Sequence, residues 1–140
     1  MAIDFSNIKL EVIDLYTSMT PEIFINVNGV TFSTRVVDDL GYPQNVQYCT
    51  DPEHHIFAIK PCKSNEVMAA PFAKPKSETS SGNNTISSVN KNLHDILCAM
   101  IPNYAPRVRY RVVGEFNAEN RVMYFDMSTA EESSFRKTAE

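Results

Sequence analysis

Two groups of histidine and cysteine residues are the first candidates for chemistry in this chain. His54 and His55 lie in a predicted hairpin turn with Cys49 and Cys62 nearby in the sequence, and imidazole and thiolate are zinc ligands. Neighbouring residues of an extended segment point to opposite faces, so the two histidines are poorly placed to chelate one ion. The cysteine spacing matches no familiar ligand set. The sequence therefore predicts no metal site and no cofactor.

The second group is His94 and Cys98. Their i, i+4 spacing on a predicted helix would bring a base beside a thiol, as nucleophilic catalysis requires. The alternative is a buried inert thiol, because Cys98 falls among the apolar positions of that helix. The sequence contains no glycine-rich phosphate loop, GxSxG elbow, HExxH pair or P-loop. It favours a protein without catalytic activity, and we assign no catalytic residue.

A third feature is a set of alternating arginines in the second half of the chain. On a strand they would project from one side, with Tyr110 between them, and could neutralise the phosphates of a nucleic acid. The alternative is an edge strand whose charges prevent aggregation between sheets. The candidate nucleic-acid or anion contacts are Arg107, Arg109, Arg111, Arg121 and Lys91.

Composition and charge limit the classes of protein that fit. The chain has 140 residues, of which 43% are hydrophobic and 21% charged, which is ordinary for a globular domain. Its net charge of -4 comes wholly from residues 1–63, which hold four basic and eight acidic residues. An acidic amino half disfavours DNA as a partner. The amino terminus does not resemble a signal peptide, and the three cysteines include no CxxC pair, so we expect a cytoplasmic location and buried free thiols.

The sequence predicts that the first half begins with strands. Apolar stretches rich in β-branched residues predict strands within 5–16 and 22–32, the first centred on residues 8–13. Asn28-Gly29 suits the positive φ angles of a tight turn, which makes residues 23–32 a hairpin. Ser33 or Thr34 would then cap a short helix that ends at Gly41.

A short helix followed by a hairpin is predicted twice, over residues 33–59 and 92–126. The first hairpin has its turn at 51–54. The second helix, capped by Ser88 or Asn90, has apolar positions that include Ile96 and ends at Pro102. A turn at 117–120 in the last hairpin would place Arg111 opposite Asp126. Strands 107–113 and 121–126 would make up this hairpin.

These elements predict an α+β fold. We expect mostly antiparallel β-hairpins with two short helices, arranged as an open barrel or small sheets, with a possible pseudo-repeat of helix and hairpin. Because each half buries little surface by itself, we also expect a homodimer. The expected segments are a β-rich unit with a short helix at 1–72, a flexible polar linker or loop at 73–88, a helix plus hairpin unit packing on the first at 89–130, and a frayed tail at 131–140.

Residues 25–59 resemble the AbrB and MraZ type of swapped-hairpin domain. Gly29 looks like the loop glycine of that family, Leu40-Gly41 like its helix end and Asp51-Pro52-Glu53 like its final turn. The resemblance implies a small barrel, closed by a second copy, that binds DNA.

The chain also departs from that family. Val30 and the pair Asp38-Asp39 stand where such regulators usually carry basic residues, and these acids would repel a phosphate backbone. We therefore keep two functional hypotheses. The first is a non-catalytic interaction or assembly protein, of the kind of a bacterial or phage accessory factor. The alternative is a DNA-binding transcriptional regulator of AbrB/MraZ-like type that uses the three alternating arginines.

Overall fold

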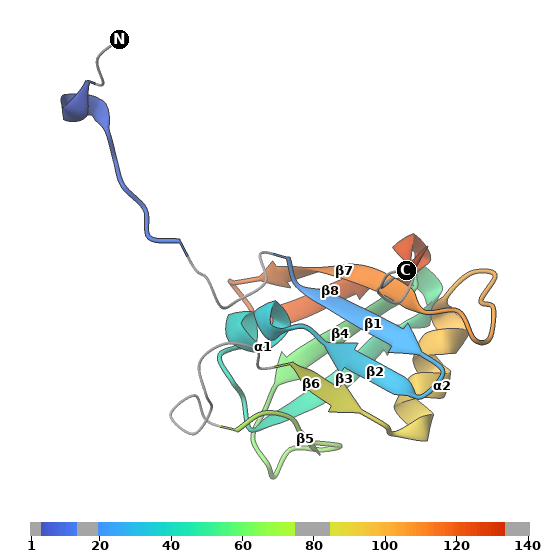
Figure 1. The fold of residues 1–140 in the computed structure, drawn as a ribbon. Helices are drawn as coiled ribbons and strands as arrows, with labels where there is room; N and C mark the ends of the chain where they lie inside the picture. Colours follow the sequence, from blue (N-terminus) through green and yellow to red (C-terminus); the bar gives the residue numbers. More distant parts are fainter. Residues whose placement is uncertain (1–3, 14–19, 75–84, 134–140) are drawn as a thin grey trace.

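The computed structural model describes residues 4–13, 20–74 and 85–133. In this part of the chain all strand pairs are antiparallel and join into one curled, half-barrel sheet with two α-helices (Figure 1). The strands are β1 (Glu22–Asn26), β2 (Gly29–Phe32), β3 (Asn45–Asp51), β4 (Ile56–Pro61), β5 (Ala70–Pro71), β6 (Ile86–Ser88), β7 (Tyr110–Asn117), β8 (Val122–Asp126) and β9 (Glu131–Glu132). The helices are α1 (Thr34–Leu40) and α2 (Lys91–Met100), and short 3-10 turns occupy Phe5–Asn7, Pro52–His54 and Met127–Thr129. None of the helices in these described ranges is long and apolar enough to cross a bilayer.

The sheet order is β5-β3-β4-β8-β7-β1-β2-β6, with β9 added beside β7. Strand β7 joins the two halves, since its residues 110–113 pair with β1 and its residues 114–117 pair with β8. Gly114 stands at the change of partner, where an added Cβ would lie 2.5 Å from the Phe125 ring. A glycine here lets β7 bend closely past that ring.

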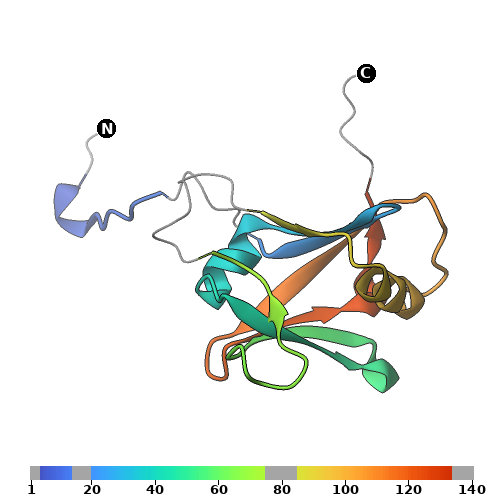
Figure 2. The ribbon, with the colours of Figure 1, turned by 90° about the horizontal axis from the view of Figure 1, so that it is seen from below.

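The two halves of the curled sheet form two layers, with α1 and α2 at opposite ends of the space between them (Figure 2). Inward-facing apolar residues, both aromatic and aliphatic, from both layers and from the helices fill that space. The largest fully buried side chains are Phe32, Phe57, Phe125, Ile23, Ile25, Leu40, Ile59, Leu97, Met123, Met127, Val30 and Val36.

The first hairpin is confirmed, but its turn differs from the prediction. Asn26 pairs with Gly29, so the two turn residues are Val27 and Asn28, and Gly29 is the first residue of β2. The Asn26 side chain shapes the turn by accepting hydrogen bonds from the Asn28 and Gly29 N–H groups at 2.8 and 3.0 Å. The expected positive φ at Asn28-Gly29 is wrong; Gly29 is needed because a Cβ would collide with the Ser88 carbonyl of β6.

Both predicted helices form. Gly41 ends α1 in the left-handed region with φ 82°, as expected. Ser33 precedes α1, but its hydroxyl accepts from the Glu22 N–H at 3.0 Å instead of capping the helix. The Asn90 side chain caps α2 by accepting from the Leu93 N–H at 3.0 Å. Ile96, assigned to the apolar face of this helix, is 49% exposed.

The expected first strand is wrong over residues 5–13. Phe5–Asn7 form a 3-10 turn, and residues 8–13 continue as an extended segment outside the sheet. Their alternating composition suits a strand, but no neighbouring strand of the described chain supplies hydrogen-bond partners. Residues 14–16 of that prediction lie outside the described ranges.

The last hairpin forms with its pairing displaced by two residues. Gly114 lies opposite Phe125 and Asn117 opposite Val122, so Arg111 does not face Asp126. The Asn117 side chain accepts from the Glu119 and Asn120 N–H groups at 3.0 and 3.2 Å, which moves the turn to residues 118–121. A shift of two leaves every side chain on its predicted face.

Two predicted irregular segments contain strands. Residues 86–88, assigned to the polar linker, form β6, and Glu131–Glu132 of the predicted frayed tail form β9. Residues 75–84 and 134–140 lie outside the described ranges. Residues 33–59 and 92–126 each contain a helix followed by an antiparallel pair, while their origin as copies of one unit stays a prediction.

Candidate functional site

The alternating arginines have different neighbours. Strand β7 begins at Tyr110, so Arg107 precedes it, with φ 72°, on the exposed loop after α2. The Arg109 guanidinium lies 4.2 Å from the centre of the Phe24 ring. Arg111 pairs with Glu22 of β1 and lies 3.7 Å from Glu131 of β9. Two of the three arginines therefore contact their own sheet.

The other two basic candidates also have partners within the chain. Arg121 donates from Nη2 to the Leu40 carbonyl oxygen at 3.1 Å, at the C-terminal end of α1. Lys91 forms an ion pair of 2.8 Å with Asp95 in the first half of α2. Arg121 therefore lies by α1 and Lys91 lies on α2, and these two helices are at opposite ends of the two-layer core.

The histidine and cysteine groups are separated by the fold. The His54 Nδ1 lies 2.8 Å from an Asp51 carboxylate oxygen, whereas the His55 Nδ1 lies 3.1 Å from the Met100 carbonyl oxygen. No cluster of three potential metal-ligating side chains occurs among the residues that the structure describes. Cys49 is exposed and Cys62 half-buried, so the expectation of buried thiols holds only for Cys98.

His94 and Cys98 do meet, with the Cys98 Sγ 3.6 Å from His94 Nε2. The same Nε2 lies 2.6 Å from the Asn26 carbonyl oxygen, which can only accept, so this nitrogen is the donor of that bond. Burial raises the pKa of the Cys98 thiol, and the hydrogen bond with Cys98 and burial together raise the pKa of Tyr104 to about 12. A protonated buried thiol is a poor nucleophile, so the pair connects α2 to β1 without forming an activated cysteine.

A hollow of the described surface lies where the half-barrel is open. Strands β5 and β6 are the two ends of the sheet, and each pairs with one neighbour only. A cavity of about 560 Å³ opens between them, and a second of about 200 Å³ adjoins it toward α1 and shares Phe72 and Ile86. We call the larger cavity the seam groove; it is lined by Tyr48, Ala70, Pro71, Phe72, Ile86, Ser87, Ser88, Val89, Asn90 and Leu93.

Comparisons of the chain with protein-family models, curated proteins and solved structures found no match.

Aromatic rings form one wall of the seam groove. Phe72 and Tyr48 both pack on the buried Phe32, with ring centres 5.6 and 6.1 Å apart. Tyr48 also stacks on Phe57 at 6.0 Å, which connects the groove to the core. Burial raises the pKa of Tyr48 to about 12, so its phenol is neutral at physiological pH. These rings fix a neutral, largely apolar wall.

Within the described ranges, β6 pairs with β2 alone, so one of its backbone edges has no strand neighbour. Alternate residues of an antiparallel strand direct their N–H and C=O groups to opposite sides. Thr31 of β2 directs its groups toward β1, as the pairing of Asn26 with Gly29 requires. Ser87 lies opposite Thr31, with their hydroxyl oxygens 3.1 Å apart, so its backbone groups point away from β2 and into the seam.

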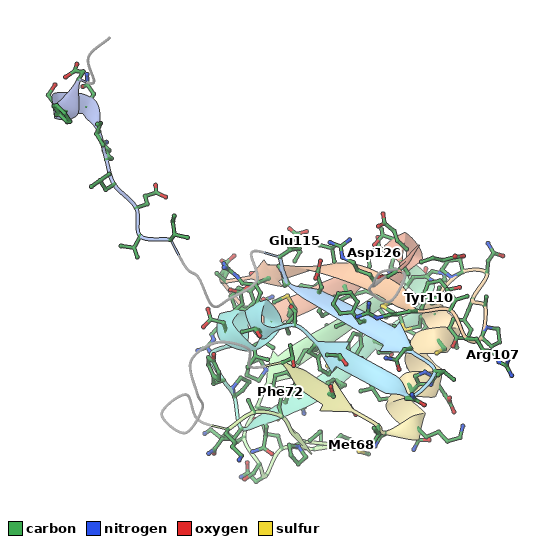
Figure 3. All side chains as sticks on the ribbon, viewed as in Figure 1. Met68, Phe72, Arg107, Tyr110, Glu115 and Asp126 are labelled. Atoms are coloured by element: carbon green, nitrogen blue, oxygen red, sulfur yellow. The ribbon has the colours of Figure 1, made fainter. Side chains whose placement is uncertain are left out.

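None of the described residues that line the seam groove is charged, and Lys74 is the charged residue among those that line the adjoining cavity. Arg107 lies at a different side of the molecule from Phe72 (Figure 3). An apolar groove beside a free strand edge suits an extended peptide, whose backbone bonds to the edge while alternate side chains enter the groove. The sequence analysis missed this site because Ile86–Ser88 is short and mostly polar. Its strand conformation is recognisable only from its pairing with β2.

Proposed function

We propose that this protein is a non-catalytic interaction module whose seam groove binds an extended polypeptide segment by strand addition. The observation that carries the proposal is the open seam, where an apolar cavity of about 560 Å³ lies directly beside the backbone edge of β6. An exposed strand edge is a ready template for pairing with another chain. A cytoplasmic location remains a prediction.

The composition of the groove favours a peptide over a small charged ligand. Its wall contributes two aromatic rings, Ala70 and Ile86, and its polar groups are hydroxyls, the Asn90 amide and backbone. Phosphates and carboxylates usually require Arg, Lys or a cluster of N–H donors. In strand addition, hydrogen bonds between the peptide backbone and the strand edge provide affinity. The alternate apolar side chains of the peptide that enter the groove provide selectivity.

The proposal is tested with peptides selected from a random decapeptide library displayed on phage and panned on the full chain. Binding of each selected peptide is measured by fluorescence anisotropy. Ser87→Pro removes the N–H that faces the seam, and we expect it to weaken binding at least about tenfold. Ser87→Ala is the matched control, because it loses the same hydroxyl and keeps the N–H; its affinity should stay within about twofold.

A second variant on the other wall of the groove tests the proposal independently, in case Ser87→Pro does not fold. Pro71→Arg places a charge on the opposite wall at an exposed position, and it should also weaken binding. Circular dichroism confirms that each variant is folded. Failure to enrich any peptide, or affinities that neither wall variant changes, would overturn the proposal.

A further inference from the structure

Residues 4–13, which we call the N-terminal arm, carry apolar side chains that are largely exposed. Leu10 is 91% exposed and Val12 is 100% exposed, and Ile13 is 77% exposed. Within the described chain, the hydrogen bonds of the arm connect its own residues near Asp4. The arm extends away from the sheet in both views (Figures 1 and 2). Such exposure normally marks a surface that is covered in an assembly.

The arm has the pattern of a strand that faces a groove. Ile8, Leu10 and Val12 alternate with Lys9 and Glu11, so in an extended conformation the three apolar side chains share one face. The two charged residues then share the other face, together with Ile13. This is the half-buried pattern that the seam groove requires of an added strand.

We propose that the arm of one copy adds to β6 of a second copy and fills its seam groove with Ile8, Leu10 and Val12. This inference rests on the proposed function of the groove and names its occupant. Among the residues that the structure describes, β6 has an unpaired edge beside an apolar cavity, and the arm is an exposed apolar segment with strand alternation. Ile8, Leu10 and Val12 span five positions, about 17 Å at about 3.4 Å per residue, so the segment is longer than the three residues of β6 beside which it would lie.

A second copy fits better than the same chain as the source of the arm. Within one chain the arm lies apart from both β5 and β6. Lys9 and Glu11 on its outer face have opposite charges, so residues 8–12 bring no net charge to the seam groove, whose described lining residues are uncharged. Two such exchanges, each arm in the partner's groove, give a closed two-fold dimer.

The test compares the dissociation constant of the dimer between full-length variants by sedimentation equilibrium. Leu10→Ser with Val12→Ser removes two groove-facing side chains, and we expect the dissociation constant to rise about a hundredfold. Lys9→Ser with Glu11→Ser is the matched control on the opposite face, with unchanged net charge and an expected change of less than about threefold. Ser87→Pro should dissociate the dimer, and Ser87→Ala should keep it.

Mixed labelling then distinguishes the two sources of the arm. A ¹³C-labelled copy is mixed with an unlabelled copy, and filtered NOEs report only contacts between copies. We expect NOEs between the Leu10 and Val12 methyl groups of one copy and Ile86 of the other. A monomer at about 100 μM, a dimer that survives Leu10→Ser with Val12→Ser, or NOEs confined to one copy would overturn the inference.

The two proposals can fail separately. The Leu10→Ser, Val12→Ser chain has an empty groove, so it is titrated with a synthetic peptide of residues 4–13 and with the phage-selected peptides. Binding of the selected peptides without binding of the arm peptide refutes arm exchange and keeps the interaction module. Binding of neither peptide refutes both.

Discussion

Gly29 shows how one residue serves a different purpose from the one its type suggests. An Asn-Gly pair ordinarily indicates a turn with positive φ angles, but here the turn is Val27-Asn28 and Gly29 is a strand residue. The absence of a side chain allows the Ser88 carbonyl of β6 to approach the backbone of β2. Gly29 therefore determines whether β6, one wall of the seam groove, can pair.

Replacing Gly29 with alanine should destabilise the protein by about 1–3 kcal/mol, because the new methyl group must displace Ser88. The free energy of unfolding is measured by urea denaturation. Val27→Ala in the same turn is the control, since Val27 is 62% exposed and its truncation should change stability by less than about 0.5 kcal/mol. Equal stability of the Gly29→Ala protein and the wild type would contradict the close approach.

At the scale of elements, ion pairing and aromatic packing connect strands from distant parts of the chain. Arg111 on β7 lies between Glu22 on β1 and Glu131 on β9, and Glu22 is only 15% exposed. Tyr48 on β3 stacks between Phe32 on β2 and Phe57 on β4. Arg111, a candidate for anion binding in the sequence analysis, therefore makes ion pairs within its own sheet. Tyr48 connects the aromatic rings of two other strands.

Arg111→Ala should cost about 1–3 kcal/mol of unfolding free energy, because it leaves the Glu22 carboxylate half-buried beside no cation. Arg107→Ala, on the exposed loop, should change stability by less than about 0.5 kcal/mol. Combining Arg111→Ala with Glu22→Gln should recover part of the loss, as measured by a double-mutant cycle in urea. Equal costs for the two arginines would show that the ion pair contributes nothing.

The raised pKa of Tyr48 gives stability a defined pH dependence. The ordinary tyrosine value is 10.0 and the folded value is about 12, so above pH 10 the unfolded chain releases the proton more readily than the folded one. Stability should be independent of this group below pH 10 and should fall as pH rises to 12, by about 1–2 kcal/mol after allowance for partial exposure.

Tyr48→Phe keeps the ring and removes the ionisable group. Its unfolding free energy at pH 7 should stay close to that of the wild type, and its loss between pH 10 and pH 12 should be smaller. The remaining loss is expected from Tyr104, whose pKa is also raised to about 12. Parallel pH profiles for wild type and Tyr48→Phe would contradict the assignment.

The whole molecule is an acidic half-barrel with an open apolar seam and a detached apolar arm. Its net charge is -4, and of the five candidate basic residues, Arg109, Arg111, Arg121 and Lys91 contact groups of their own chain. DNA affinity depends on cations that neutralise phosphates. For the alternative of a DNA-binding regulator, Arg107, Arg121 and Lys91 are the exposed candidates, and the last two already contact groups of their own chain.

We expect binding to a 30-base-pair duplex to be weaker than about 100 μM at 150 mM salt, as measured by fluorescence anisotropy. Tighter binding with a steep salt dependence, flattened by replacing Arg107, Arg109 and Arg111 with alanine, would favour the DNA-binding alternative. The same triple variant needs a stability control, because Arg111 also supports the sheet.

The sequence by itself determined the local elements. Residue alternation predicted the hairpin at 23–32, helical spacing predicted α2, Gly41 predicted the end of α1, and together these indicated an α+β fold of antiparallel hairpins. These features depend on residues that are close together in the sequence, so the spacing of residue types is sufficient to predict them.

Only the tertiary structure decided which strands meet. It paired β6 with β2 and bent β7 at Gly114, gave Arg109 and Arg111 partners on their own sheet, and left β5 and β6 apart with a groove between them. It also left residues 8–13 outside the sheet although their pattern suits a strand. The physical reason is that a strand is completed by hydrogen bonds and burial against distant residues, so its partner is not encoded in the spacing of its own side chains.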